Sequence, residues 1–260
     1  MSERTTETDW APSREAIHAR TERVIPRGFF YKPREGAASR DTFQLAPLIV
    51  QEISNGAADL PEDDRIAGLV LDANGHLSFH TDRPAVYVDV SIVQLNGQDH
   101  DQLSYTWFYP LRTGHDYITW RCCRMTLDGE GLPIIWEVLG SQSGPDALYV
   151  SKSLELGAAA AFGPPLTGRR FSIETDMNSR SDVRVARILD DGPRPMGPFV
   201  YLTAEDLEVM TLTCRCMPSQ VRDLPHSAYY ELRPLSELRK ITTRLDPVRL
   251  DRVLRLPASF

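Results

Sequence analysis

A long run of short alternating segments, starting near residue 66, constrains the fold of this chain more than any other feature. Residues 85–95 alternate apolar with more polar side chains, and Asn96-Gly97 follows them. A period of two is typical of a strand with one buried face, and Asn-Gly is a strong signal for a hairpin turn. We expect one apolar row to be buried together: Val86, Val88, Val90 and Ile92.

Segments of this kind recur about every ten residues, separated by Gly, Pro and Asn-Gly turns. Together with residues 85–95, residues 103–109 and 117–127 are expected to form three neighbouring antiparallel strands. The pattern predicts a mainly β fold, an antiparallel barrel or sandwich of about nine strands with short helices at the N- and C-terminal ends, and not βαβ units. The expected strands are residues 66–71, 76–81, 85–95, 103–109, 117–127, 132–139, 147–154, 170–175 and 183–189.

The two ends of the chain differ from this central part. Residues 1–40 begin with a polar stretch and later place three aromatic residues between prolines, so we expect a partly disordered N-terminal arm. Residues 41–232 form the expected antiparallel β domain. Residues 233–260 form the expected helical extension, and a capping pattern also predicts a short helix from Ala204.

The charges of the C-terminal extension suggest where it lies. Basic side chains outnumber acidic ones in residues 233–255, whereas acidic side chains dominate residues 41–232. The stretch 236–255 has an apolar side, and a short amphipathic helix is not stable alone in water. We expect it to dock on the acidic body of the same chain or of a second copy. The sequence therefore leaves a homo-oligomer open.

The composition and the apolar stretches of the chain limit the class of protein to which it can belong. The chain has 260 residues, 42% hydrophobic residues and a formal net charge of -7, which is ordinary for a globular protein. No apolar stretch is long enough for a membrane helix, and the N-terminus lacks the apolar core of a secretory signal. We expect a soluble, cytoplasmic protein without membrane contact. The acidic body argues against nucleic acid as a partner.

An aromatic row provides the expected binding site. Tyr105, Trp107 and Tyr109 share one face of residues 103–109, with further aromatic and polar residues on segments nearby. Buried Tyr and Trp need hydrogen-bond partners, and small-molecule pockets combine aromatic walls with a few polar groups. A sheet face covered by helices is the more ordinary explanation of the row. The expected ligand-binding residues are His80, Tyr87, Asp89, Tyr105, Trp107, Tyr109 and Trp120.

Other constellations argue against specific chemistries. His76 and His80 have the spacing of a helical zinc site, but on a strand they lie about 13 Å apart, so no metal ligands are assigned. The four cysteines lack the spacing of a zinc site and read as buried apolar side chains. The chain has no P-loop, dinucleotide-binding motif or nucleophile elbow. Catalytic residues and cofactors stay unassigned.

Two functions from different classes follow. The first is a small-molecule-binding or assembly module with an aromatic-lined pocket. The second is a metal-assisted or acid–base hydrolase or isomerase that uses His and Asp from strand-end loops. The sequence does not decide whether the protein is an enzyme.

Overall fold

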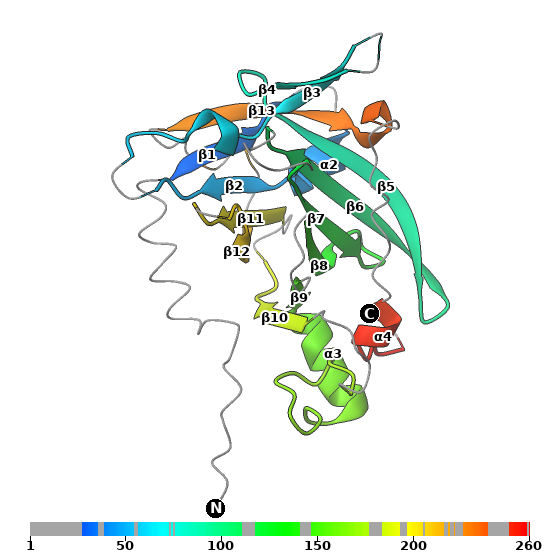
Figure 1. The fold of residues 1–260 in the computed structure, drawn as a ribbon. Coiled ribbons are helices and arrows are strands. Elements are labelled where there is room, and N and C mark those ends of the chain that lie inside the picture. Colours follow the sequence, from blue (N-terminus) through cyan, green and yellow to red (C-terminus); the bar gives the residue numbers. More distant parts are fainter. Residues whose placement is uncertain are drawn as a thin grey trace, which may run out of the picture.

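In a computed structural model of the chain, eleven strands form one mixed sheet that curls into a nearly closed barrel (Figure 1). The mainly β fold expected from the sequence is confirmed, and the sheet has more strands than expected. The structure describes residues 28–35, 39–54, 57–72, 74, 76–110, 118–140, 147–176, 184–192, 197–204, 206–215, 218, 221, 226–238, 250–258 and 260.

The order across the sheet is β10-β9-β8-β7-β6-β5-β13-β1-β2-β11-β12, and β3 and β4 form a separate two-stranded sheet. In chain order the strands of the large sheet are β1 (Phe29–Pro33), β2 (Leu48–Gln51), β5 (Ala85–Leu95), β6 (Gln98–Phe108), β7 (Trp120–Leu127), β8 (Pro133–Gly140), β9 (Ala147–Ser151), β10 (Arg184–Leu189), β11 (Gly197–Leu202), β12 (Val209–Arg215) and β13 (Ser227–Pro234). The small sheet consists of β3 (Gly68–Leu71) and β4 (Leu77–His80).

The strand directions correct the sequence prediction. β5, β6 and β7 are antiparallel neighbours as expected. Four other pairs are parallel: β9 with β10, β5 with β13, β13 with β1, and β2 with β11. Parallel neighbours need long crossover connections, which no local turn signal reveals. The sheet is therefore mixed, and the prediction of a purely antiparallel sheet is wrong.

One of these crossovers is a helix that the sequence analysis missed. Helix α3 (Lys152–Phe162) joins the parallel strands β9 and β10, so the chain does contain a βαβ unit. Ser151 caps the helix by accepting a hydrogen bond from the Leu154 amide, and Gly163 ends it with φ of 80°. The expected strand 147–154 thus stops at Ser151. Residues 170–175 contain only an isolated bridge at Glu174, so the strand expected there is also wrong.

Residues 29–33, which the sequence assigned to an arm, form β1 between β13 and β2. The helix expected from Ala204 is absent from the described residues around it. There the Thr203 amide donates to the Glu208 carbonyl oxygen and closes a turn. The helical segments besides α3 are short: α2 (Arg40–Leu45), η2 (Glu62–Asp64), η4 (Leu235–Leu238) and α4 (Leu250–Val253). No helix in the described part of the chain is long and apolar enough to cross a membrane.

A side chain bridges the two edges of the large sheet. Arg187 of β10 donates from its guanidinium to the Leu212 carbonyl oxygen of β12 at 2.8 Å. This hydrogen bond connects the two edge strands of the sheet where it nearly closes.

The inner face of the barrel is filled with side chains. The buried apolar row that β5 contributes to this face is shorter than expected. Val86 is fully buried there, whereas Val90 is 62% exposed and Ile92 is 67% exposed. β13 pairs with β5 only as far as Val88. The rest of β5 runs on with β6 as a projecting hairpin (Figure 1). The prediction that all four residues of the row are buried together is therefore wrong for its second half.

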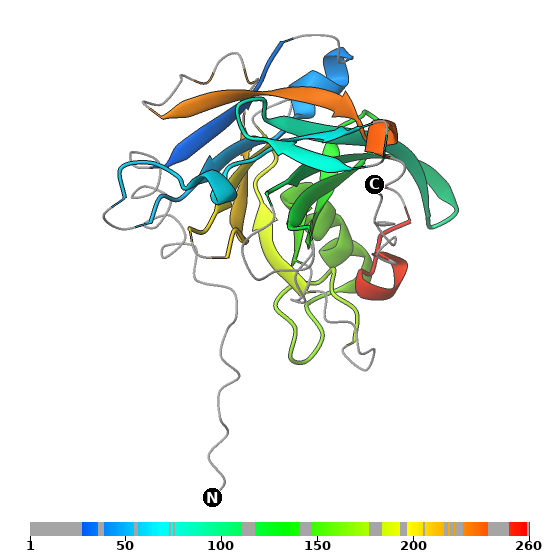
Figure 2. The same ribbon diagram turned by 45° about the horizontal axis from the view of Figure 1, so that its top comes forward.

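The C-terminal segment packs on the outer face of the barrel, beside α3 (Figure 2). Leu250, Val253 and Leu254 are buried in a cluster with residues of α3 and β9. The Asn96 side-chain amide donates a hydrogen bond to the Leu256 carbonyl oxygen at 3.0 Å. Of the stretch 236–255 expected to dock, Leu238, Leu250, Val253 and Leu254 are buried against their own chain, and residues 239–249 lie outside the described part.

Candidate functional site: the hairpin groove

The aromatic row expected to line a pocket lies in the packed interior of the barrel. Tyr105, Trp107 and Tyr109 are fully buried in the inner cluster. The Tyr105 hydroxyl donates to the Thr42 carbonyl oxygen at 2.7 Å, and the Trp107 indole donates to the Tyr109 hydroxyl at 2.9 Å. Their polar tips therefore have protein partners, as buried aromatic residues require. This arrangement is that of a structural core.

The other expected site residues lie outside the barrel interior, on β4, β5 and β7. Val86 and Val88 face the interior, so Tyr87 and Asp89 point outward. Tyr87 is buried against Phe108 and belongs to an outer cluster that half-buried Trp120 joins. Asp89 is exposed. The barrel wall thus separates the seven expected residues into two groups, and they cannot form one pocket.

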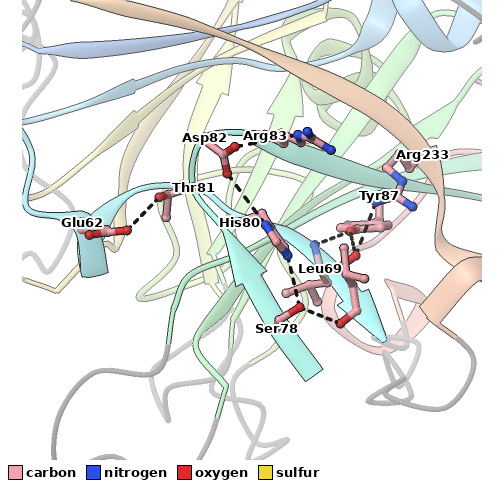
Figure 3. A network of polar contacts seen from close by, with 10 residues as sticks. Glu62, Leu69, Ser78, His80, Thr81, Asp82, Arg83, Tyr87 and Arg233 are labelled. Carbon is pink, nitrogen blue, oxygen red and sulfur yellow. Dashed lines mark hydrogen bonds and ion pairs between the residues drawn. The ribbon is translucent and has the colours of Figure 1, made fainter. Parts of the chain in front are cut away.

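What buries Tyr87 is the β3–β4 hairpin, which lies over the outer face of β5 (Figure 3). The Tyr87 hydroxyl accepts a hydrogen bond from the Leu69 amide at 2.8 Å and lies 3.3 Å from the Leu69 carbonyl oxygen. Burial is the main cause that raises the pKa of Tyr87, so its hydroxyl stays protonated and can donate. Tyr87 therefore fixes the height and register of the hairpin above the barrel.

Glycine at position 68 lets the hairpin approach the barrel closely. A Cβ atom at Gly68 would lie 2.3 Å from the carbonyl oxygen of Arg83, a distance that no side chain tolerates. The contact joins the first residue of β3 to the turn before β5. The close approach needs a residue without a Cβ, so the sequence has Gly here for a steric reason.

A third contact fixes the hairpin from β13. Arg233 lies over the Tyr87 ring, with its guanidinium carbon 5.7 Å from the ring centroid. One of its nitrogens reaches the Leu69 carbonyl oxygen at 3.4 Å, and another pairs with the Glu237 carboxylate at 2.6 Å. Arg233 thus connects the barrel, the hairpin and η4.

The hairpin, β13 and the end of β1 line an open groove of about 480 Å³. Its polar wall residues come from three different parts of the chain, and most of them are charged. The lining residues are Arg34, Gly68, Val70, His80, Asp82, Arg83, Pro84, Tyr229, Glu231 and Arg233. Of the residues expected to bind a ligand, only His80 lines this groove.

A row of three polar side chains runs from β4 into the turn that follows it (Figure 3). Ser78 Oγ lies 3.2 Å from His80 Nε2, and His80 Nδ1 lies 3.9 Å from the nearer Asp82 oxygen. Ser78 Oγ also donates to the Val70 carbonyl oxygen at 3.2 Å. Ser78 and His80 share one face because strand positions two apart point the same way, and Asp82 follows them in the turn. They have the residue types of a Ser-His-Asp hydrolytic site.

The two histidines of the sequence pattern have separate partners. His76 lies 3.1 Å from Asp72, whereas His80 contacts Ser78 and Asp82. Within the described part of the chain, no group of three or more His, Cys, Asp or Glu side chains is placed to hold a metal ion.

The thiols of β7 are buried on both faces of the strand. Burial is the main cause that raises the pKa of Cys122 to about 11, and burial also raises the pKa of Cys123. Both side chains are therefore neutral thiols near pH 7, which are weak nucleophiles and weak metal ligands. The two other cysteines of the sequence are Cys214 and Cys216. The side chain of Cys214 and the whole of Cys216 lie outside the described residues.

No family model, curated protein or solved structure matches this chain. The function must therefore be argued from the geometry of the groove. Sequence reasoning missed its arginines, Arg34, Arg83 and Arg233, because they come from segments that only the fold brings together. The one local signal was the spacing of Arg233 and Glu237, which suits an ion pair.

Proposed function

We propose that this protein is a non-catalytic binding module that holds a small molecule in the hairpin groove. The observation that carries the proposal is the groove itself, a hollow of about 480 Å³ with charged groups converging from β1, the hairpin and β13. Small-molecule sites occupy roughly 300–1,000 Å³ and use a few placed polar groups for orientation. The proposal moves the expected ligand from the aromatic row of the interior to the outer face.

The fixed position of the hairpin supports this function. Tyr87, Gly68 and Arg233 each set the distance between the hairpin and the barrel. A groove held open in this way loses little conformational freedom when a ligand enters, so less binding free energy is spent on ordering it. The lining adds an exposed aromatic surface at Tyr229, which is 40% exposed.

A fragment screen tests the proposal. Ligand-observed NMR with a mixture of small acids, amines and neutral aromatic compounds is run on the wild type and on Val70→Trp, which fills the groove from its 46% exposed lining valine. Val90→Trp is the matched control, because Val90 is also an exposed strand valine and lies outside the groove. We expect fragment signals that Val70→Trp removes and Val90→Trp keeps. Signals that survive in Val70→Trp contradict the proposal.

The row Ser78–His80–Asp82 favours ester hydrolysis as a second candidate function. In such a reaction Ser78 Oγ attacks the ester carbonyl carbon, and His80 Nε2 takes the hydroxyl proton and passes it to the leaving alcohol. Water then releases the acid from Ser78. This candidate ranks second because 3.9 Å between His80 and Asp82 exceeds a hydrogen-bond length, and because the Val70 carbonyl competes for the Ser78 proton.

Hydrolysis of 4-nitrophenyl acetate separates a serine mechanism from simple imidazole catalysis. A histidine alone can cleave this activated ester, so His80→Asn does not discriminate between the two. Ser78→Ala must lower the rate of hydrolysis if Ser78 is the nucleophile, while His76→Asn serves as the control for an exposed imidazole on the same hairpin. An unchanged rate in Ser78→Ala excludes the serine mechanism.

A further inference from the structure

We infer that the ligand of the hairpin groove is a small molecule with an anionic oxygen group, a carboxylate or a phosphate, and that Arg34 and Arg83 hold this group. The inference rests on the proposed function, because it names the class of ligand for the same groove. It is carried by the charges of the lining and by the partners that each charged group has.

The lining has the opposite sign to the chain as a whole. Three guanidinium groups and two carboxylates face the groove, whereas the whole chain has a formal net charge of -7. Charges within about 8 Å act most strongly at physiological ionic strength, so a bound ion responds mainly to this local set. The lining is therefore much less acidic than the protein as a whole, and the partners of each arginine decide what it can bind.

Arg233 is the arginine of the lining whose guanidinium already has partners within the protein. Its guanidinium pairs with Glu237 at 2.6 Å and reaches the Leu69 carbonyl oxygen. Its charge is thus largely balanced by Glu237, and its position is set by the hairpin. We assign Arg233 a positioning role.

Arg34 and Arg83 keep their guanidinium groups available. The Arg34 side chain, just beyond β1, makes no ion pair within the described part of the chain. The nearest Arg83 nitrogen lies 3.8 Å from the Asp82 carboxylate, beyond hydrogen-bond length, and the Arg83 side chain is 82% exposed. A guanidinium presents five donors in a planar fork that matches a carboxylate or a phosphate. Among the described residues, neither guanidinium has a carboxylate within hydrogen-bond length, and an anion in the groove would supply such an acceptor.

The two carboxylates of the lining differ in their neighbours. Asp82 lies beside Arg83 and His80, so cationic or protonatable groups face it. Glu231 is exposed on β13 and makes no ion pair with any described residue. Glu231 therefore opposes an anion in the groove, and removing its charge should strengthen anion binding.

The experiment measures binding of two soluble anions, inorganic phosphate and succinate, to the full chain by amide NMR shifts at low ionic strength. Glycerol and ethylammonium serve as the neutral and cationic probes. We expect saturable shifts at β3 and β4 with at least one anion, and affinity at least about tenfold lower in Arg34→Gln/Arg83→Gln. Glu231→Gln should bind the anion roughly twofold or more tightly, because one repulsive charge is removed.

Lys152→Gln/Arg170→Gln is the matched control, because it also removes two positive charges at positions outside the groove lining. Its affinity should equal that of the wild type. Equal affinity in Arg34→Gln/Arg83→Gln, or saturable binding of glycerol or ethylammonium alone, overturns the inference.

The two proposals fail in different ways. If fragments bind and Val70→Trp removes them, but neither anion binds, the anionic ligand class is wrong and the binding function stands. If Val70→Trp removes no binding at all, the proposed function itself fails. Circular dichroism of each variant shows that the fold is kept, so a loss of binding is not a loss of structure.

Discussion

The barrel interior and the hairpin groove lie on the two faces of the same sheet, yet the two faces differ in how completely they are covered. On the inner face of β6, Tyr105 and Trp107 are fully buried, and their polar atoms bond to other parts of the protein. On the outer face of β5, Tyr87 is also buried, but by a separate hairpin that leaves a groove beside it. The inner face closes through curvature of the sheet, whereas the outer face closes only in part.

This difference shows which aromatic residues hold the fold together and which support a site. The interior row contributes by filling volume, so its loss should affect the whole molecule. Tyr87 and Gly68 contribute by holding a hairpin in place, so their loss should act first on the groove.

Truncation of Trp107 should destabilise the whole protein. Trp107→Ala is expected to lower the free energy of unfolding by about 3–5 kcal/mol, because it leaves a large cavity in the barrel. Denaturant unfolding measures the change. Trp120→Ala, at a half-buried residue of the outer cluster, should cost less. Equal losses in the two variants would remove the distinction between interior and outer face.

A methyl group at position 68 should push the hairpin away from the barrel. Gly68→Ala places a Cβ against the Arg83 carbonyl oxygen and is expected to cost roughly 1–3 kcal/mol as the backbone shifts. Thermal unfolding and the fragment signals of the groove are both measured. Gly129→Ala is the control, because nothing lies within 4 Å of its Cβ position. A Gly68→Ala protein with wild-type stability and wild-type groove binding would contradict the close contact.

Removal of one hydroxyl should loosen the hairpin alone. Tyr87→Phe leaves the Leu69 amide without its acceptor at a buried position, which costs about 1–2 kcal/mol. Hydrogen exchange should speed up at Leu69 while the amides of β6 keep their protection. Tyr229→Phe, at an exposed tyrosine of the groove, should leave Leu69 protected. Unchanged exchange at Leu69 in Tyr87→Phe would show that the hydroxyl does not hold the hairpin.

The effect expected to be smallest near neutral pH is a loss of stability that appears only at high pH. The pKa of Cys122 is raised by burial to about 11 from an ordinary value of 9.0. The unfolded chain therefore releases this proton at lower pH than the folded protein, and stability falls as pH rises from about 9 to 11. Comparison of unfolding free energies for the wild type and Cys122→Ala measures the contribution. A pH dependence that is identical in both proteins would refute the buried-thiol account.

Local signals in the sequence were sufficient for the hairpins and insufficient for the sheet. Asn96 and Gly97 have φ of 51° and 76°, the positive values that an Asn-Gly hairpin turn requires, so β5 and β6 were predictable. The parallel pairing of β1 with β13 joins segments from opposite ends of the chain. No turn chemistry encodes such a pairing, and the short β1 flanked by prolines resembled an irregular arm.

The candidate site was predictable only in part, for the same reason. His80 was expected in the site as a polar neighbour of the aromatic row, and it does line the groove. Tyr105 and Trp107 have the composition of a pocket wall, but alternation alone does not say whether a face encloses a cavity or a packed core. Arg34, Arg83 and Arg233 meet only because the hairpin folds over β5 beside β13.

The account's central claim is that a ligand enters the groove and not the barrel interior. An amide and indole NMR titration with the tightest-binding anion tests it in one spectrum. We predict saturable shifts at Gly68, Val70 and His80, while the indole N–H of Trp107 keeps its position because it is bonded to Tyr109 in the core. A shift of the Trp107 indole signal without shifts at the hairpin would contradict the account and return the site to the interior row.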